Sequence, residues 1–144
     1  MASNRVSPPV ADGRPSILCV DGNERMLEVI AKILAPLPVK CVTVSDPVAA
    51  IEEARRLHPR LVILNWQLPQ MSGWELLCAL RAEMQAAPPR VIILSAREGG
   101  FEQMLAQNVA GADAYLEKPL EIDRLRQEVS RLLEGPLSGN RPHD

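Results

Sequence analysis

A run of four aliphatic residues followed by an abrupt polar break constrains this chain more than any other feature. Leu61 to Leu64 read L-V-I-L, and the sequence then changes at once to Asn65 and a loop that contains Pro69 and Gly73. A strand without a polar face is typical of a parallel sheet covered on both sides. In such sheets the functional site lies just beyond the carboxyl ends of the strands. Asn65 is therefore expected where chemistry takes place, although its amide is a poor nucleophile.

Short apolar segments alternate with amphipathic ones along the rest of the chain. The segments that predict strands are 16–20, 39–44, 61–64, 91–94 and 114–116. Helices are predicted between them: Asp46-Pro47 supplies a cap and first residue, and Ser72 with Glu75 has capping-box spacing. A weaker helical stretch runs through Phe101, Met104 and Leu105. The last helix should turn one face inward, made of Ile122, Leu125, Val129, Leu132 and Leu133. Five strands alternating with five helices indicate an α/β fold with a parallel sheet.

Composition limits the classes of function. The 144 residues suit one domain, predicted at 16–134 between flexible tails at 1–15 and 135–144. The net charge is −2 without a basic stripe, so we expect no nucleic-acid binding and no DNA-binding domain in this chain. No apolar run approaches the ~20 residues that a membrane span needs. Cys19, Cys41 and Cys78 lack paired spacing, which favours buried thiols and a cytoplasmic location.

Polar residues stand at the ends of four predicted strands. Asp21 follows the first strand, Asn65 the third, Ser95 the fourth, and Lys118 comes just after the fifth. Each of these residues could be an ordinary turn or surface residue. Because the carboxyl ends of parallel strands meet at one edge of the sheet, the four groups are expected to lie together.

The segments that carry these residues resemble the receiver domain of two-component response regulators. The similarity rests on I-L-C-V-D at 17–21, L-V-I-L-N-W-Q-L-P-Q-M-S-G at 61–73, V-I-I-L-S-A at 91–96 and G-A-D-A-Y-L-E-K-P at 111–119. The resemblance implies a flavodoxin-like three-layer sandwich with strand order 2-1-3-4-5 and five helices. It also implies roles for Asp21 as a pocket acid, Ser95 as the hydroxyl, Lys118 as the pocket lysine and Tyr115 as the aromatic switch residue.

Two positions depart from the pattern of this family. Gly22 stands where receivers have a second acid, and Asn65 stands where they have the phosphoacceptor aspartate. A neutral amide cannot replace the carboxylate nucleophile that forms an acyl phosphate. With Asp21 facing Lys118 alone, the formal charge is zero, so Mg²⁺ binding should be weak or absent even if the Gln67 carbonyl is available. Glu24 is a conceivable stand-in acid, but its spacing does not match the family.

These departures predict a pseudo-receiver: a phosphorylation-independent protein-interaction module that is not an enzyme and needs no cofactor. The resemblance to receivers implies that its partner, which could be a second copy of the chain, would bind the face formed by the helix around 101–108, the strand at 114–116 and the last helix. Tyr115, Met104, Leu105 and Asn108 are the candidate interface residues. Two alternatives stay open. The domain could still phosphorylate itself on an unrecognised acid, for which Asp21 is the only one well placed, or it could sense a small molecule in the neutralised pocket.

Overall fold

A computed structural model describes residues 13–96 and 111–134 of the chain. Strands and helices alternate along the described part. Their bounds are β2 Ser16–Val20, α1 Glu24–Leu34, β3 Lys40–Val44, α2 Pro47–Leu57, β4 Leu61–Asn65, α3 Gly73–Glu83, β5 Arg90–Ser95, β6 Ala114–Glu117 and α5 Ile122–Glu134. All five predicted strands are present, and each predicted boundary lies within a residue or two of the observed one.

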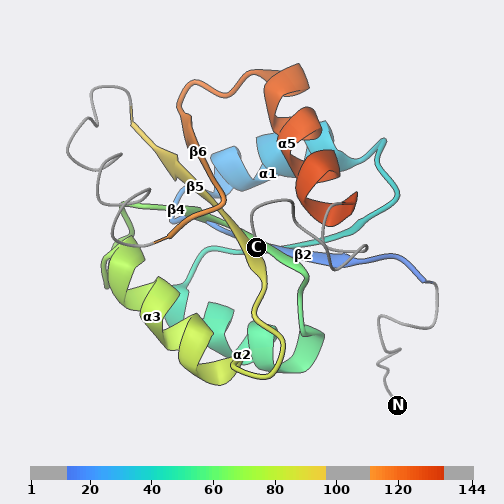
Figure 1. Cartoon of the computed structure of the whole chain (residues 1–144). Helices are drawn as coiled ribbons and strands as arrows, with labels where there is room; N and C mark the ends of the chain where they lie inside the picture. The colour runs from blue at the N-terminus through green and yellow to red at the C-terminus, as the bar shows by residue number, and fades with distance from the viewer. Residues whose placement is uncertain (1–12, 97–110, 135–144) are drawn as a thin grey trace, which may run out of the picture.

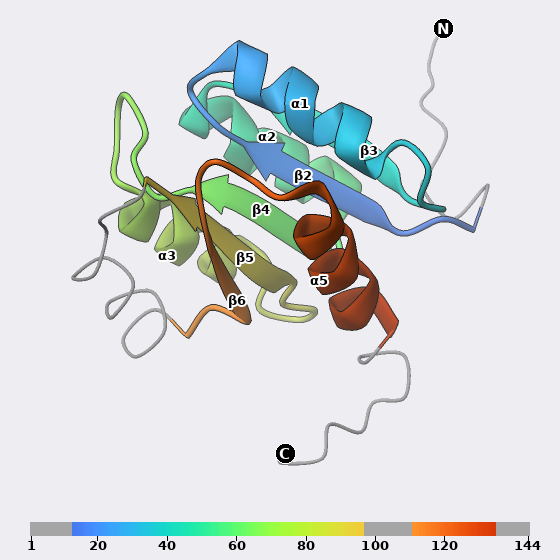
Figure 2. The same cartoon turned by 90° about the horizontal axis from the view of Figure 1, so that it is seen from above.

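The five strands form one parallel sheet in the order β3-β2-β4-β5-β6. Counted along the chain this order is 2-1-3-4-5, which confirms the predicted topology. The helices cover both sides of the sheet: α1 and α5 lie on one side, and α2 and α3 lie on the other (Figure 1). The view from above shows β4 near the middle of the sheet, with β2 and β5 beside it (Figure 2). The aliphatic run thus occupies the most protected position in the sheet.

The side chains of the central strands alternate between two hydrophobic cores. On β4, Val62 and Leu64 pack with the residues of α2 and α3, whereas Leu61 and Ile63 pack with those of α1 and α5. All four are fully buried. Because successive side chains of a strand point to opposite faces, a strand between two helical layers has no position for a polar residue. This explains the unbroken apolar run.

Local sequence signals set the helix ends. Ser72 and Glu75 form the predicted capping box, with the Ser72 hydroxyl accepting from the Glu75 N–H at 3.1 Å. Asp46 caps α2, with Pro47 as its first residue. The cap of α1 is Asn23, which was not predicted; its side-chain oxygen accepts from two backbone N–H groups of the first turn. Asparagine directly before an amphipathic helix was the available signal.

One predicted core residue is wrong. Ile122 is 53% exposed, whereas the other four members of that predicted face are buried. It is the first residue of α5, and the buried face of the helix begins only at Leu125. The described residues contain four helices; the helical stretch at 101–108, with Met104, Leu105 and Asn108, lies outside them, as do 1–12 and 135–144 of the predicted tails. No helix in the described ranges is long and apolar enough to span a membrane.

Candidate functional site

Loops at the carboxyl ends of β2, β4 and β6 enclose a cavity of about 520 Å³. We call it the strand-end pocket. The residues that line it are Asp21, Gly22, Asn23, Asn65, Gln67, Pro69 and Lys118. The structure therefore brings together five of the residues predicted from sequence, which come from positions almost a hundred residues apart. Parallel topology accounts for this, because every strand delivers its next residue to the same edge of the sheet.

Asp21 is held by the protein on both of its carboxylate oxygens. Its Oδ1 accepts a hydrogen bond from the backbone N–H of Asn23 at 2.9 Å, and its Oδ2 lies 3.0 Å from the Lys118 ammonium. The Asp21 side chain is 2% exposed and that of Lys118 is 22% exposed. Charge-assisted contacts of this kind are stronger than hydrogen bonds between neutral groups. Asp21 is thus a buried carboxylate whose two oxygens both have partners within the domain.

Asn65 turns its amide toward the neighbouring loop. Its Nδ2 donates to the carbonyl oxygen of Gln67 at 2.6 Å. The orientation of the amide is fixed by this contact, since a carbonyl oxygen can only accept and the NH₂ end must face it. The other end, Oδ1, is buried and has no hydrogen-bond partner within the described part of the chain. An aspartate could not make the contact with Gln67, because an ionised carboxylate has no donor.

Gly22 allows the loop after β4 to approach β2 closely. A Cβ placed on Gly22 would lie 2.8 Å from Cδ and 3.3 Å from Cγ of Pro69. Contacts below about 3 Å between carbon atoms are strongly repulsive, and a proline ring cannot rotate away as a flexible side chain can. The ring of Pro69 thus occupies the space that a side chain at position 22 would need. The sequence contains no signal for this contact, because nothing in it measures the distance between two loops.

Two predicted residues do not line the pocket. Ser95 is fully buried at the end of β5, where its carbonyl accepts from the Lys118 N–H at 2.8 Å. Glu24 accepts a hydrogen bond from the Ser45 hydroxyl at 3.4 Å and lines a separate groove beside α1. Glu24 is therefore no substitute for the missing acid in this arrangement.

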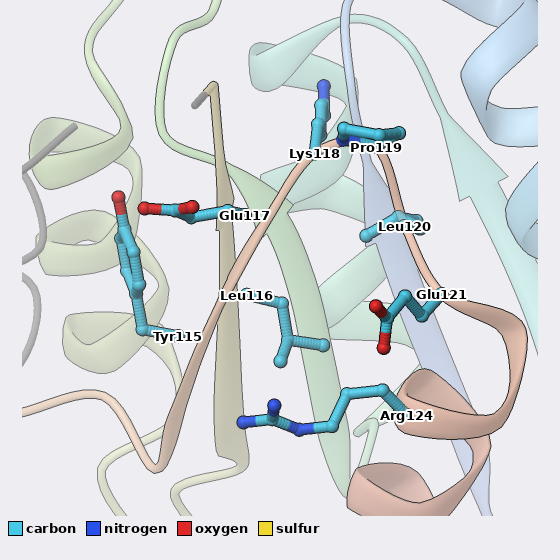
Figure 3. Close-up of a pocket in the computed structure, with 8 residues that line it drawn as sticks. All are labelled: Tyr115, Leu116, Glu117, Lys118, Pro119, Leu120, Glu121 and Arg124. Atoms are coloured by element: carbon cyan, nitrogen blue, oxygen red, sulfur yellow. The ribbon is translucent and has the colours of Figure 1, made fainter. Parts of the chain in front are cut away.

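Tyr115 lies at a second cavity, of about 640 Å³, formed by β6 and the start of α5. We call it the β6–α5 groove; its lining residues are 115–121 and Arg124. Figure 3 shows Glu117 directed toward the side of Tyr115, with Glu121 and Arg124 on the opposite wall. Lys118 points away from these side chains, in agreement with its contact to Asp21. Tyr115 itself is 7% exposed and packs into the core beside α2 and α3.

The residues of the strand-end pocket do not fit a divalent metal. Magnesium is held by several oxygen ligands, of which carboxylates supply the charge. The pocket contains one carboxylate, Asp21, and its charge is balanced by Lys118. The backbone carbonyl that remains as a ligand, that of Gln67, accepts from Asn65. Across the described ranges no group of three or more acidic, histidine or cysteine side chains is arranged to hold a metal ion.

Comparison with known proteins agrees with this geometry. Residues 17–130 match the profile of the response regulator receiver domain family. TcrX of Mycobacterium tuberculosis is 35% identical over 85% of this chain and 52% of its own length, and the transcriptional regulatory protein KdpE of the same organism is 34% identical over 80% and 51%. This chain thus spans about half the length of these relatives. The signal receiver domain of an HD domain-containing protein from Pseudomonas fluorescens Pf-5 superposes with a TM-score of 0.78 at 29% identity, covering 87% of this chain and 98% of the other.

The family profile, the order of the strands and the position of the pocket all indicate the same protein family. The strand order is that of the receiver fold, and Asp21 and Lys118 meet at the carboxyl ends of β2 and β6. This chain belongs to the response regulator receiver domain family of two-component signal transduction.

Proposed function

We propose that this receiver domain works without phosphorylation, as a module that binds another protein. One observation carries the proposal: the polar groups at the positions that serve phosphoryl transfer in receivers already form hydrogen bonds or ion pairs with other groups of the domain. The Asn65 amide donates to the Gln67 carbonyl, and Lys118 pairs with Asp21. An amide at position 65 offers no carboxylate nucleophile to a phosphoryl donor. The pocket is thereby held in a single arrangement that needs neither metal nor phosphate.

Asp21 is poorly suited to replace the missing acceptor. Its side chain is 2% exposed, and both of its oxygens already accept charge-assisted or backbone contacts. An attack on phosphorus would require a free lone pair and access for a phosphoryl donor. Self-phosphorylation on an unrecognised acid is therefore the less favoured candidate.

The β6–α5 groove supports the second half of the proposal. It is lined by an aromatic ring, two carboxylates and a guanidinium, a mixture of apolar and polar groups of the kind that protein partners contact. The Arg124 side chain is 54% exposed and pairs with Glu128 at 3.5 Å. We expect a protein, or a second copy of this chain, to bind there. A cytoplasmic location agrees with this role and stays a prediction.

Phosphorylation is tested by intact-mass spectrometry after incubation with acetyl phosphate or phosphoramidate and Mg²⁺. The expected result is no added phosphate, while a receiver with an acceptor aspartate gains one under the same conditions. A phosphate mapped to Asp21 would instead support self-phosphorylation. Deamidation of Asn65 must be excluded by peptide mapping, since it would create an acceptor.

Binding is tested separately by sedimentation velocity over a range of concentrations, alone and with candidate partners. Arg124→Ala should weaken any association, whereas Arg25→Ala on α1 provides a matched exposed control on another face. If Arg124→Ala and Arg25→Ala weaken association equally, the β6–α5 groove is not the binding surface.

A further inference from the structure

Two cysteines that are far apart in sequence meet between the strands β2 and β3. The sulfur atoms of Cys19 and Cys41 are 3.6 Å apart, a distance at which one thiol donates a hydrogen bond to the other sulfur. Both side chains belong to the core on the α1 and α5 side of the sheet. The third cysteine, Cys78, is exposed on α3 in the opposite layer, so the expectation of a buried thiol is wrong at this position.

Burial decides which of the two sulfurs can carry a negative charge. Cys19 is fully buried on a central strand, whereas Cys41 is half-buried on the edge strand β3. Removing a thiolate from water is costly, so the charge is best placed on the more accessible sulfur. The contact with Cys41 and burial raise the pKa of Cys19, while the hydrogen bond from Cys19 lowers the pKa of Cys41. When Cys41 carries the charge, its thiolate can only accept, so Cys19 is then the donor in this contact.

The charged side chains near the two cysteines do not favour a negative charge on Cys19 over one on Cys41. Lys40 neighbours Cys41 on the strand and projects from the opposite face of the sheet, since successive side chains alternate. On α1, which packs against β3, Glu24 and Glu28 line a groove with Thr43 and Ser45, toward the carboxyl end of the strand. Lys32 lies in the last turn of that helix. The Cys19 thiol is thus the group in hydrogen-bond contact with Cys41.

The strand register argues against a disulfide between the two. Cys41 is paired with Ile17, and Cys19 is paired with Thr43, so the two cysteines are offset by two residues on adjacent strands. Strand spacing and rise place their Cα atoms about 8 Å apart. A disulfide needs a Cα separation below about 7 Å. Bridging them would require one strand to slide, which the sheet hydrogen bonds on both sides of β2 oppose.

We propose that Cys41 is a modification site: a thiolate, stabilised by the Cys19 thiol, that peroxides oxidise to a sulfenic acid. The Cys41 sulfur attacks one oxygen of hydrogen peroxide, the S–O bond forms as the O–O bond breaks, and the departing hydroxide takes a proton to become water. The sulfur is oxidised and the peroxide is reduced. Because the Cys41 side chain is partly exposed, a small peroxide can reach its sulfur without opening the sheet.

The test measures the alkylation rate of each cysteine by iodoacetamide across a pH series, resolved by peptide mass spectrometry. In Cys19→Ala, which removes the donor, the rate at Cys41 should fall severalfold near neutral pH, and Cys19→Ser should recover part of it because a hydroxyl also donates. The rate at exposed Cys78 should not change and serves as the internal reference. Unfolding the wild-type chain in urea should shift the Cys41 profile to higher pH, a comparison that needs no substitution.

Peroxide treatment followed by dimedone should label Cys41 and leave Cys19 unlabelled. Non-reducing peptide maps should show no bridge between the two residues. Three results would overturn the proposal: a Cys41 rate that is insensitive to Cys19→Ala, an unshifted profile in the unfolded wild type, or a Cys19–Cys41 disulfide as the main product.

Discussion

Replacing Asn65 by aspartate would test the reasoning about the pocket most directly. The change substitutes one oxygen for one nitrogen, and it removes the donor that now lies 2.6 Å from the Gln67 carbonyl. In its place stands a charged oxygen that repels the carbonyl. It also adds a second carboxylate to a pocket whose Lys118 already pairs with Asp21. Restoring the residue typical of the family should therefore destabilise this domain when no metal is present.

The magnitude follows from the hydrogen bond that this substitution removes. A net hydrogen bond contributes about 1 kcal/mol, and a buried polar group left facing the wrong partner costs about 1–3 kcal/mol. We expect Asn65→Asp to lose about 2–4 kcal/mol of unfolding free energy at neutral pH, within the upper range for point substitutions. The loss corresponds to a fall in melting temperature of roughly 4 °C per kcal/mol for a domain of this size. The penalty should shrink as the pH falls from neutral toward the usual carboxyl pKa of about 4, because the carboxyl in the folded domain is protonated more readily and can then donate to Gln67.

Asn23→Asp supplies the matched control. It makes the same chemical change in the same pocket, but at an exposed helix cap where aspartate performs as well as asparagine. Asn23→Asp should change the unfolding free energy by no more than about 0.5 kcal/mol. Urea unfolding of the two variants and the parent measures the difference. If Asn65→Asp is as stable as the parent at pH 7 without metal, the contact between the amide and the Gln67 carbonyl is not what stabilises the pocket.

The same pocket geometry supports three further predictions. Gly22→Asp should cost about 1–3 kcal/mol by overpacking against Pro69, and a double-mutant cycle with Pro69→Ala should return most of that loss; additive effects would contradict the contact. Lys118→Met leaves the buried Asp21 carboxylate without its cation and should lower the unfolding free energy, measured in urea, by about 2–4 kcal/mol. This range already allows for the solvent screening of a lysine that is 22% exposed, and Lys118→Arg should cost less. Millimolar Mg²⁺ should leave the melting temperature of the parent unchanged but raise that of a variant carrying Gly22→Asp and Asn65→Asp; a saturable rise in the parent would refute the charge argument.

The sequence was sufficient for those features that depend on neighbours along the chain. The apolar run at 61–64 predicted the central strand, and Ser72 with Glu75 predicted the start of α3, because both patterns report local geometry. The meeting of Asp21 and Lys118 was also predictable, since parallel topology brings strand ends to one edge. Ile122 was misplaced because helical spacing shows which face a residue shares, but not where along the helix that face becomes buried.

Other features depend on distances that no local pattern contains. The approach of Pro69 to Gly22 depends on how two loops are placed, and the Cys19–Cys41 contact depends on the register of two strands. The cysteine spacing of 22 residues carries no signal for a pair until the strands are aligned. The hydrogen bond from Asn65 to Gln67 likewise depends on the turn taken by the loop after β4.

The ring of Pro69 lying against Gly22 makes the loss of the acidic pocket difficult to reverse one residue at a time. An aspartate restored at position 22 meets the proline before it can gain a metal, and an aspartate restored at position 65 meets the Gln67 carbonyl before it can gain a phosphate. Each single step back lowers stability without yet recovering chemistry. Gly22 and Asn65 therefore each make a contact that an aspartate at the same position would disrupt, so both would have to change together, with metal present, before any gain could offset the loss of stability.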